Sequence, residues 1–207
     1  MNGEQFYVIT ADIIASRKQE EAPRRAREGL AALNLRHRSA LAAEFTLYRG
    51  DEIQGALRGS ADLIRTLRHL RFFLPGLKLR AGVGAGAISA GLEQKYAWQM
   101  DGSAFHRSRA ALEKIKNRRT PATCFHGEEQ KRWETVSAFY ELIDTIQSRW
   151  TIKQWQAVDA YERAGTYAAA SLELGISPQN VAKRCRAASW KAVFGAERFL
   201  TAYLNQG

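Results

Sequence analysis

The first part of the chain alternates between short apolar runs and stretches in which apolar residues recur at helical spacing. Residues 5–14 (QFYVITADII) form a continuous apolar run with aromatic and β-branched side chains, which predicts a buried strand ending near Asp12. After Pro23, a residue favoured in the first turn of a helix, apolar positions recur every three or four residues. A second helix is predicted over residues 60–73, with Ser60 as its N-cap.

Further segments complete a predicted sheet. Residues 44–48 and 52–57 flank Gly50 and predict a β-hairpin. Residues 77–90 (LKLRAGVGAGAISA) predict one strand or a tight pair, and their alternating glycines favour close approach of a helix or a partner subunit. This order is the split βαβ or ferredoxin-like arrangement, so we expect an α+β fold: an antiparallel sheet with helices on one face. More helices are predicted downstream, over residues 104–115 and 128–146.

From Thr151 the pattern is helical to the end of the chain. One helix follows Thr151 as its N-cap and ends at Gly165. A second, alanine-rich helix follows Thr166 as its N-cap and is stopped by Gly175. Ser177 caps a third helix with Pro178 at its first position. Two helices joined by a short glycine-containing turn predict a helix-turn-helix. We therefore expect two domains, an α+β domain over residues 1–147 and a helix-turn-helix domain over residues 148–207.

The last of these helices carries side chains suited to reading DNA. Gln179, Asn180 and Lys183 are expected to face base edges, with Arg184 and Arg186 on phosphates. The segment TYAAASLELGISPQNVAKRCRAA also resembles the helix-turn-helix of sigma-factor region 4. Three-helix units of this kind also serve as protein-docking or dimerisation modules, and the sequence leaves that alternative open.

Composition supports an anionic partner. The chain has 31 Lys and Arg residues against 21 Asp and Glu, a formal net charge of +10, and clustered cations gain affinity for phosphates through counterion release. Cys124 and Cys185 lie far apart and have no metal-ligand spacing around them, which predicts neither a disulfide framework nor a zinc site. We expect a cytoplasmic protein without membrane insertion, because no basic region precedes the first apolar run and no apolar segment is long enough to span a bilayer.

Two carboxylates are predicted to meet at the ends of neighbouring strands. Asp12 ends the first strand, and Asp51 lies in the hairpin turn expected beside it. Paired carboxylates repel each other unless a cation lies between them, so we predict a Mg²⁺ or Mn²⁺ site with the backbone carbonyl of Ile13 as a further ligand. A capping role for Asp12 and a plain turn role for Asp51 remain open, since Asp is favoured in both.

Four segments in this order, ITADIIASRK, YRGDEIQGAL, LRAGVGAGAISAG and DGSAFHRSRAAL, resemble the SatD family. These are small bacterial proteins whose N-terminal part looks like a class III nucleotidyl cyclase catalytic domain. The resemblance covers nearly the whole chain, and the GDE turn with the RAGVGAG strand is its most specific part. It implies that Asp12 and Asp51 match the two aspartates that bind two metal ions in the cyclase domain.

The chain departs from the cyclase pattern at three positions. Phe45 stands where the cyclase has its purine-reading lysine, which implies that base recognition of that kind is lost. His106 takes the position of an Asn, and Ala110 that of a transition-state Arg. Arg109 lies one residue away, and because a helix turns about 100° per residue its guanidinium is displaced from the expected target. Cyclisation by the standard mechanism is therefore disfavoured.

Basic side chains near the start of the same helix suit a phosphate. His106, Arg107 and Arg109 follow Asp101 and Gly102, so we predict nucleotide binding there, although a solvated basic helix is the alternative. The sequence as a whole predicts a homodimeric DNA-binding transcriptional regulator with a metal- and nucleotide-binding cyclase-like domain. The alternative is a two-metal enzyme acting on nucleoside triphosphates.

Overall fold

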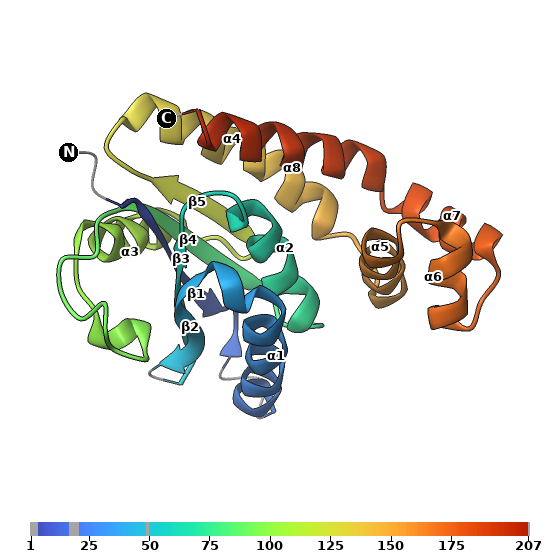
Figure 1. Cartoon of the computed structure of the whole chain (residues 1–207), viewed down its shortest axis with the longest axis horizontal. Coiled ribbons are helices and arrows are strands. Elements are labelled where there is room, and N and C mark those ends of the chain that lie inside the picture. The colour runs from blue at the N-terminus through green and yellow to red at the C-terminus, as the bar shows by residue number, and fades with distance from the viewer. Residues whose placement is uncertain (1–3, 17–20, 49, 207) are drawn as a thin grey trace.

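The computed structural model describes residues 4–16, 21–48 and 50–206, and shows an α+β fold (Figure 1). Its sheet has the strand order β2-β3-β1-β4-β5. The strands are β1 (Phe6–Ile13), β2 (Leu41–Tyr48), β3 (Glu52–Arg58), β4 (Leu79–Gly86) and β5 (Ala122–His126). The first four strands pair antiparallel in the split βαβ order, as predicted. The sheet is not wholly antiparallel, however, because β5 was not predicted and pairs parallel to β4.

Helices cover both faces of the sheet, not one as predicted. Along β1, Tyr7 and Ile9 belong to the main core, which they share with buried residues of α1 (Ala22–His37), α2 (Leu63–Phe73) and α4 (Gln130–Gln147). Val8 belongs to a separate core cluster with residues of α3 (Ser103–Ile115), on the other face. Successive strand residues point to opposite faces, so an almost continuously apolar strand is buried on both.

Glycines in β4 allow α3 to lie directly on the sheet. A Cβ atom at Gly84 would lie 2.1 Å from the carbonyl oxygen of Ala104, and one at Gly82 would lie 2.2 Å from that of Ser108. These distances are too short for any side chain, so the backbones pack in contact. The interpretation of the alternating glycines as a close-approach surface is thus confirmed, with α3 as the packing element.

The start of α2 differs from the prediction. The helix begins at Leu63 with Asp62 in the N-cap position, and Ser60 does not cap it. The hydroxyl of Ser60 instead donates a hydrogen bond to the side chain of Asn205, close to the end of the chain. A contact between residues 145 positions apart in sequence could not be inferred from local spacing.

The C-terminal region contains α5 (Ile152–Ala164), α6 (Tyr167–Leu174), α7 (Pro178–Ala187) and α8 (Trp190–Leu204). The predicted helix ends are confirmed. At the N-caps Thr151, Thr166 and Ser177 the side chain accepts a hydrogen bond from a backbone amide, and the C-cap glycines Gly165 and Gly175 have left-handed backbone conformations. The third predicted helix is in fact two, because the chain breaks at Ser189, whose φ is +52°.

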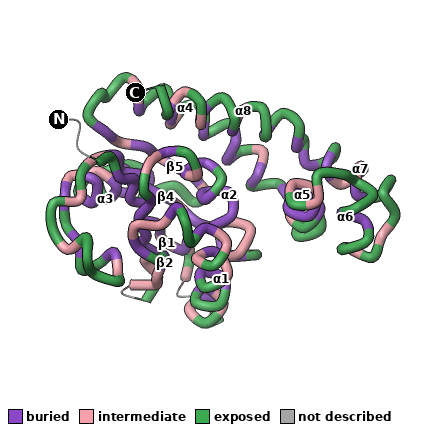
Figure 2. Tube along the Cα trace, in the orientation of Figure 1, coloured by how far each residue is buried: buried purple, intermediate pink, exposed green. Residues whose placement is uncertain are grey.

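That break turns α8 back onto the first part of the chain. Figure 1 shows α8 running along α4, while α5, α6 and α7 form one end of the molecule, and α8 also contacts α2. One apolar cluster continues from the sheet through α2 and α4 into α5, α7 and α8. In Figure 2 the buried positions line the inner sides of these helices. Both cysteines are free, and none of the described helices is long and apolar enough to cross a membrane.

Candidate functional site

The structure places Asp12 and Asp51 side by side. Asp12 pairs with Glu52 in the register of β1 and β3, and the amide of Ile13 donates to the carbonyl of Asp51 at 3.2 Å. Both aspartates line a cavity of about 360 Å³, together with Glu52 and Arg109. The other lining residues are Thr10, Leu112, Glu113 and Lys116, so the cavity lies between the sheet and α3 and holds four acidic and two basic residues.

Arg80 on β4 supplies a cation to Asp12. Its Nε and Nη2 atoms lie 2.8 and 2.6 Å from the two oxygens of Asp12, a bidentate and largely buried ion pair. Asp51 accepts a hydrogen bond from the hydroxyl of Ser16 at 2.7 Å. A divalent ion held by the predicted ligands Asp12, Ile13 and Asp51 would therefore compete with Arg80 for Asp12.

Arg80 was missed from the sequence, although a signal for it exists. Asp12 and Arg80 are Cα partners in the antiparallel pairing of β1 and β4. Directly opposed side chains lie on the same face of a sheet and interact. Fixing the register of these two strands from their apolar pattern would have placed the guanidinium beside the carboxylate.

The three residues predicted to bind a nucleotide do not converge. His106 is exposed and pairs with Asp101 at 3.3 Å. The Nη1 atom of Arg107 donates to the carbonyl of Ala85 at 2.7 Å, at the far end of β4. Only Arg109 lines the cavity that holds Asp12 and Asp51. A phosphate in this cavity would thus meet one of the three predicted basic groups, Arg109, together with Lys116, which is paired with Glu113 at 3.0 Å.

The outer face of α7 is free. Val181 and Cys185 turn inward and are buried, and the turn before the helix uses a left-handed Gly175. The predicted DNA-contacting side chains make no hydrogen bond or ion pair to any described residue, and all but the half-buried Arg184 are exposed: Gln179, Asn180, Lys183, Arg184 and Arg186. Their polar groups are therefore available to a partner.

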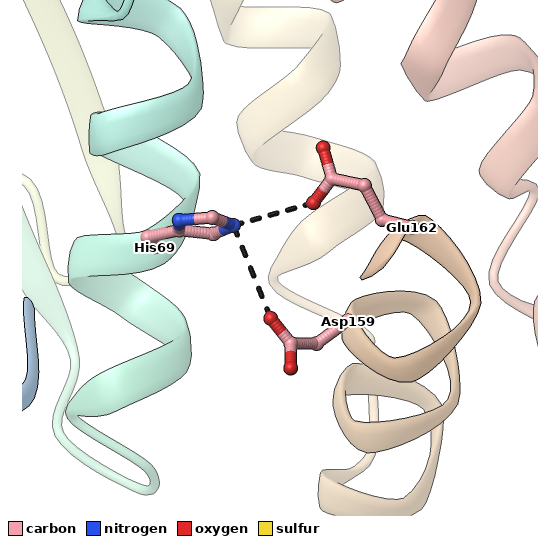
Figure 3. Close-up of side chains that lie close together, drawn as sticks. All are labelled: His69, Asp159 and Glu162. Carbon is pink, nitrogen blue, oxygen red and sulfur yellow. Dashed lines mark hydrogen bonds and ion pairs between the residues drawn. The ribbon is translucent and has the colours of Figure 1, made fainter. Parts of the chain in front are cut away.

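A second polar cluster, not predicted from the sequence, joins the sheet-bearing part of the chain to α5. His69 of α2 faces Asp159 and Glu162 of α5 (Figure 3), with Nε2 to carboxylate oxygen distances of 4.0 and 3.3 Å. These ligand types could together hold a metal ion. Each carboxylate, however, is already paired with two arginines, at 2.7 to 3.2 Å: Arg68, Arg65, Arg36 and Arg163. A metal ion would be repelled by these guanidinium groups, so we interpret the cluster as a structural junction.

Two histidines in this junction form a directed chain of hydrogen bonds. His37 Nε2 lies 2.8 Å from His69 Nδ1, and His37 Nδ1 lies 3.1 Å from the hydroxyl of Thr66. Because Glu162 can only accept when it is ionised, His69 donates from Nε2, His37 donates to His69, and Thr66 donates to His37. Burial lowers the pKa of both imidazoles, that of His37 to about 3, so both are neutral at pH 7.

Arg68 of α2 ties the junction to two further helices. Its Nε lies 3.0 Å from both oxygens of Glu197 on α8, and its Nη2 lies 2.7 Å from Glu162 on α5. Arg68 is 2% exposed and also lies over the ring of Trp190. Burial raises the pKa of Glu197 to about 7, against the opposing effect of Arg68. One guanidinium thus fixes α5 and α8 relative to the sheet.

These features define an α+β protein with a ferredoxin-like sheet, an acidic cavity between the sheet and a helix, and a C-terminal helical region containing two helices joined by a tight turn. The chain belongs to the SatD family, whose family model matches residues 6–202. No match was found among curated proteins.

Proposed function

We propose that the protein is a DNA-binding transcriptional regulator that uses α7 as its recognition helix. The observation that carries the proposal is the outer face of α7, where amide and basic side chains have no partner within the described chain. The helix begins immediately after a short turn from α6, so its first residues protrude at one end of the molecule (Figure 1). An exposed helix with Gln, Asn, Lys and Arg near its start suits the major groove.

The test is DNA affinity of the full chain, measured on duplexes selected from a random pool. Replacing Lys183 and Arg184 with Ala should weaken binding and lower the slope of log affinity against log salt by about 1, because Arg184 is the one of the two that is expected on a phosphate. The matched control replaces Arg27 and Arg38, which make no ion pair within the described residues, and removes the same charge from the other part of the chain. Equal affinity of both double variants would overturn the proposal.

Dimerisation is part of the proposal and is supported by an apolar surface on α4 and α8. Phe139, Leu142, Phe194 and Phe199 are 41 to 63% exposed, and the rings of Phe139 and Phe199 lie 5.4 Å apart. Exposed apolar patches of this kind mark interaction sites. We infer that a second copy covers it, since a two-fold arrangement in which α4 faces the partner's α8 brings unlike charges together. These are Glu134 and Glu141 on α4, the latter also paired with Arg118, and Lys191 and Arg198 on α8.

The dimer surface is tested by sedimentation of the purified chain. Phe199→Glu should shift the protein from dimer to monomer, because it places a charge in the apolar surface. Leu35→Glu, at a position 78% exposed on α1, is the control and should leave the association unchanged. A monomeric unsubstituted chain, or an unaltered Phe199→Glu dimer, would refute this surface.

A divalent ion in the Asp12 and Asp51 cavity is the proposed signal for the regulator. Asp12, the carbonyl of Ile13 and Asp51 are the proposed ligands, and Arg80 competes for the first of them. Mn²⁺ titration followed by electron paramagnetic resonance tests this. Asp51→Asn should weaken binding, and an unaltered affinity would count against the site.

The alternative function, an enzyme acting on nucleoside triphosphates, is favoured by one observation. Arg109 lines the same cavity as Asp12 and Asp51, so a phosphate could meet a guanidinium and a metal ligand together. Incubation with a panel of triphosphates and Mg²⁺ or Mn²⁺, read by chromatography, tests for turnover. If the protein is an enzyme, the unsubstituted chain should form a product that the Asp51→Asn variant does not form. Absence of any product from the unsubstituted chain would exclude enzyme function.

A further inference from the structure

A cavity of about 570 Å³ lies where the sheet-bearing part of the chain meets α5. Its walls are formed by the end of α2, by residues 74–79 leading into β4, and by residues 147–156 at the junction of α4 and α5. None of these residues lines the cavity of Asp12 and Asp51. Its volume is in the usual range for sites that enclose small molecules, about 300–1,000 Å³.

The walls are mainly apolar, and four of the lining side chains are aromatic. Phe72 and Phe73 contribute from α2, and Trp150 and Trp155 contribute from the start of the C-terminal helices, with Ile152 beside them. The two indole rings lie 4.5 Å apart, nearly edge to face. Aromatic side chains make their most favourable contacts with groups that are themselves planar and apolar, through stacked or edge-to-face packing. A planar, apolar group is therefore the best match for the interior.

The charges on the walls select an anion. Lys78 lines the cavity, is exposed, and makes no ion pair with any described residue, whereas no Asp or Glu is among the described residues that line it. A second basic wall residue, Arg71, pairs with Asp144 at 2.6 Å, and its Nε atom has no hydrogen-bond partner. Gln147, 2% exposed, also has an unpartnered Oε1. The lining thus combines apolar surface with one uncompensated cation.

We propose that this cavity binds a small molecule with a planar apolar body and a single anionic group, of the aromatic carboxylate or sulfonate class. Lys78 binds the anion and the aromatic side chains enclose the body. Trp150 also donates from Nε1 to the carbonyl of Ala188, at the break between α7 and α8. The ligand therefore touches a residue that contacts the end of the proposed recognition helix. Binding itself does not depend on DNA binding.

The test uses 1-anilinonaphthalene-8-sulfonate with the full-length protein, together with N-phenyl-1-naphthylamine, which has the same rings without the anion. The proposal expects saturable binding of the sulfonate and quenching of tryptophan fluorescence. Lys78→Glu should weaken sulfonate binding roughly five- to tenfold, the range expected when one partly exposed charge is reversed, and leave the neutral probe unaffected.

The matched control is Lys153→Glu, an exposed residue beside Ile152 that does not line the cavity. It makes the same charge change at a neighbouring position and should leave both affinities unchanged. The proposal is overturned if the sulfonate binds without saturation, or if the Lys78 and Lys153 variants bind it equally. These measurements contain no DNA, so their failure is distinct from a failure of the proposed regulator.

Discussion

Removal of Arg68 is the sharpest test of how the C-terminal helices are held to the sheet. Arg68→Ala deletes three hydrogen bonds of 2.7 to 3.0 Å, to Glu197 and Glu162, from a position that is 2% exposed. Glu162 keeps Arg65 and His69 as partners, but Glu197 keeps only Gln147, at 3.2 Å. The variant therefore leaves one buried carboxylate whose remaining cation, Arg71, acts at longer range and is itself paired with Asp144.

The expected loss of stability follows from that uncompensated charge. Breaking a buried ion pair by removing one partner costs about 3–5 kcal/mol. Because burial already raises the pKa of Glu197 to about 7, this carboxyl can take up a proton in the variant and relieve part of the cost. We therefore expect a loss of about 3 kcal/mol at pH 7, at the lower end of that range.

Urea unfolding followed by tryptophan fluorescence measures this loss. Arg24→Ala is the matched control, since Arg24 pairs with Glu21 and Glu28 on the surface, where such pairs contribute only about 0–1 kcal/mol. Adding Glu197→Gln to Arg68→Ala should restore about 1 kcal/mol or more, because it removes the buried carboxylate. The reasoning is refuted if Arg68→Ala costs no more than Arg24→Ala, or if the second substitution restores nothing.

Four further variants test other parts of the structure. His37 has a pKa lowered to about 3 from 6.5, so its contribution to stability is complete above pH 6.5 and declines as the pH falls toward 3. His37→Gln should therefore flatten the pH dependence of urea midpoints in that window, and an unchanged profile would contradict the assignment. Gly84→Ala should lower stability by several kcal/mol, on the order of 3 or more, because its Cβ would meet the backbone of α3. A Cβ at Gly195 would meet nothing within 4 Å, so Gly195→Ala should raise stability by roughly 0.5–1 kcal/mol in thermal or urea unfolding. Similar changes in stability for the Gly84 and Gly195 variants would refute the packing argument. Arg80→Gln should strengthen Mn²⁺ binding in titrations followed by electron paramagnetic resonance, since it frees Asp12. Weaker binding would indicate that Arg80 supports the site.

Local signals predicted the helical ends well. The caps at Thr151, Thr166 and Ser177 act through a side chain and an amide three residues away, which is a contact that sequence spacing can reveal. The break at Ser189 was missed because a left-handed serine has no distinctive local pattern. β5 was missed because its five residues contain a polar Thr and His and depend on β4 for pairing.

Long-range polar contacts were the hardest to predict. Arg68 and Glu197 lie 129 positions apart in sequence, and the only local sign is that Arg68 follows Ile64 by one helical turn on a buried face. The carboxylates Asp12 and Asp51 were predicted as neighbours, but the register that brings Arg80 to Asp12 was not. Contacts of this kind depend on the complete fold, because each partner comes from a different element.

The pair of Asp12 and Arg80 has a consequence for how a metal ion could act here. Where two carboxylates face each other without a cation, a bound ion or a shared proton relieves their repulsion. In this protein Arg80 already neutralises Asp12. The cavity can therefore stand without an ion, and an ion that enters competes with a guanidinium for Asp12. We infer that such binding would be reversible and would move Arg80, which suits a signal better than a permanent structural metal.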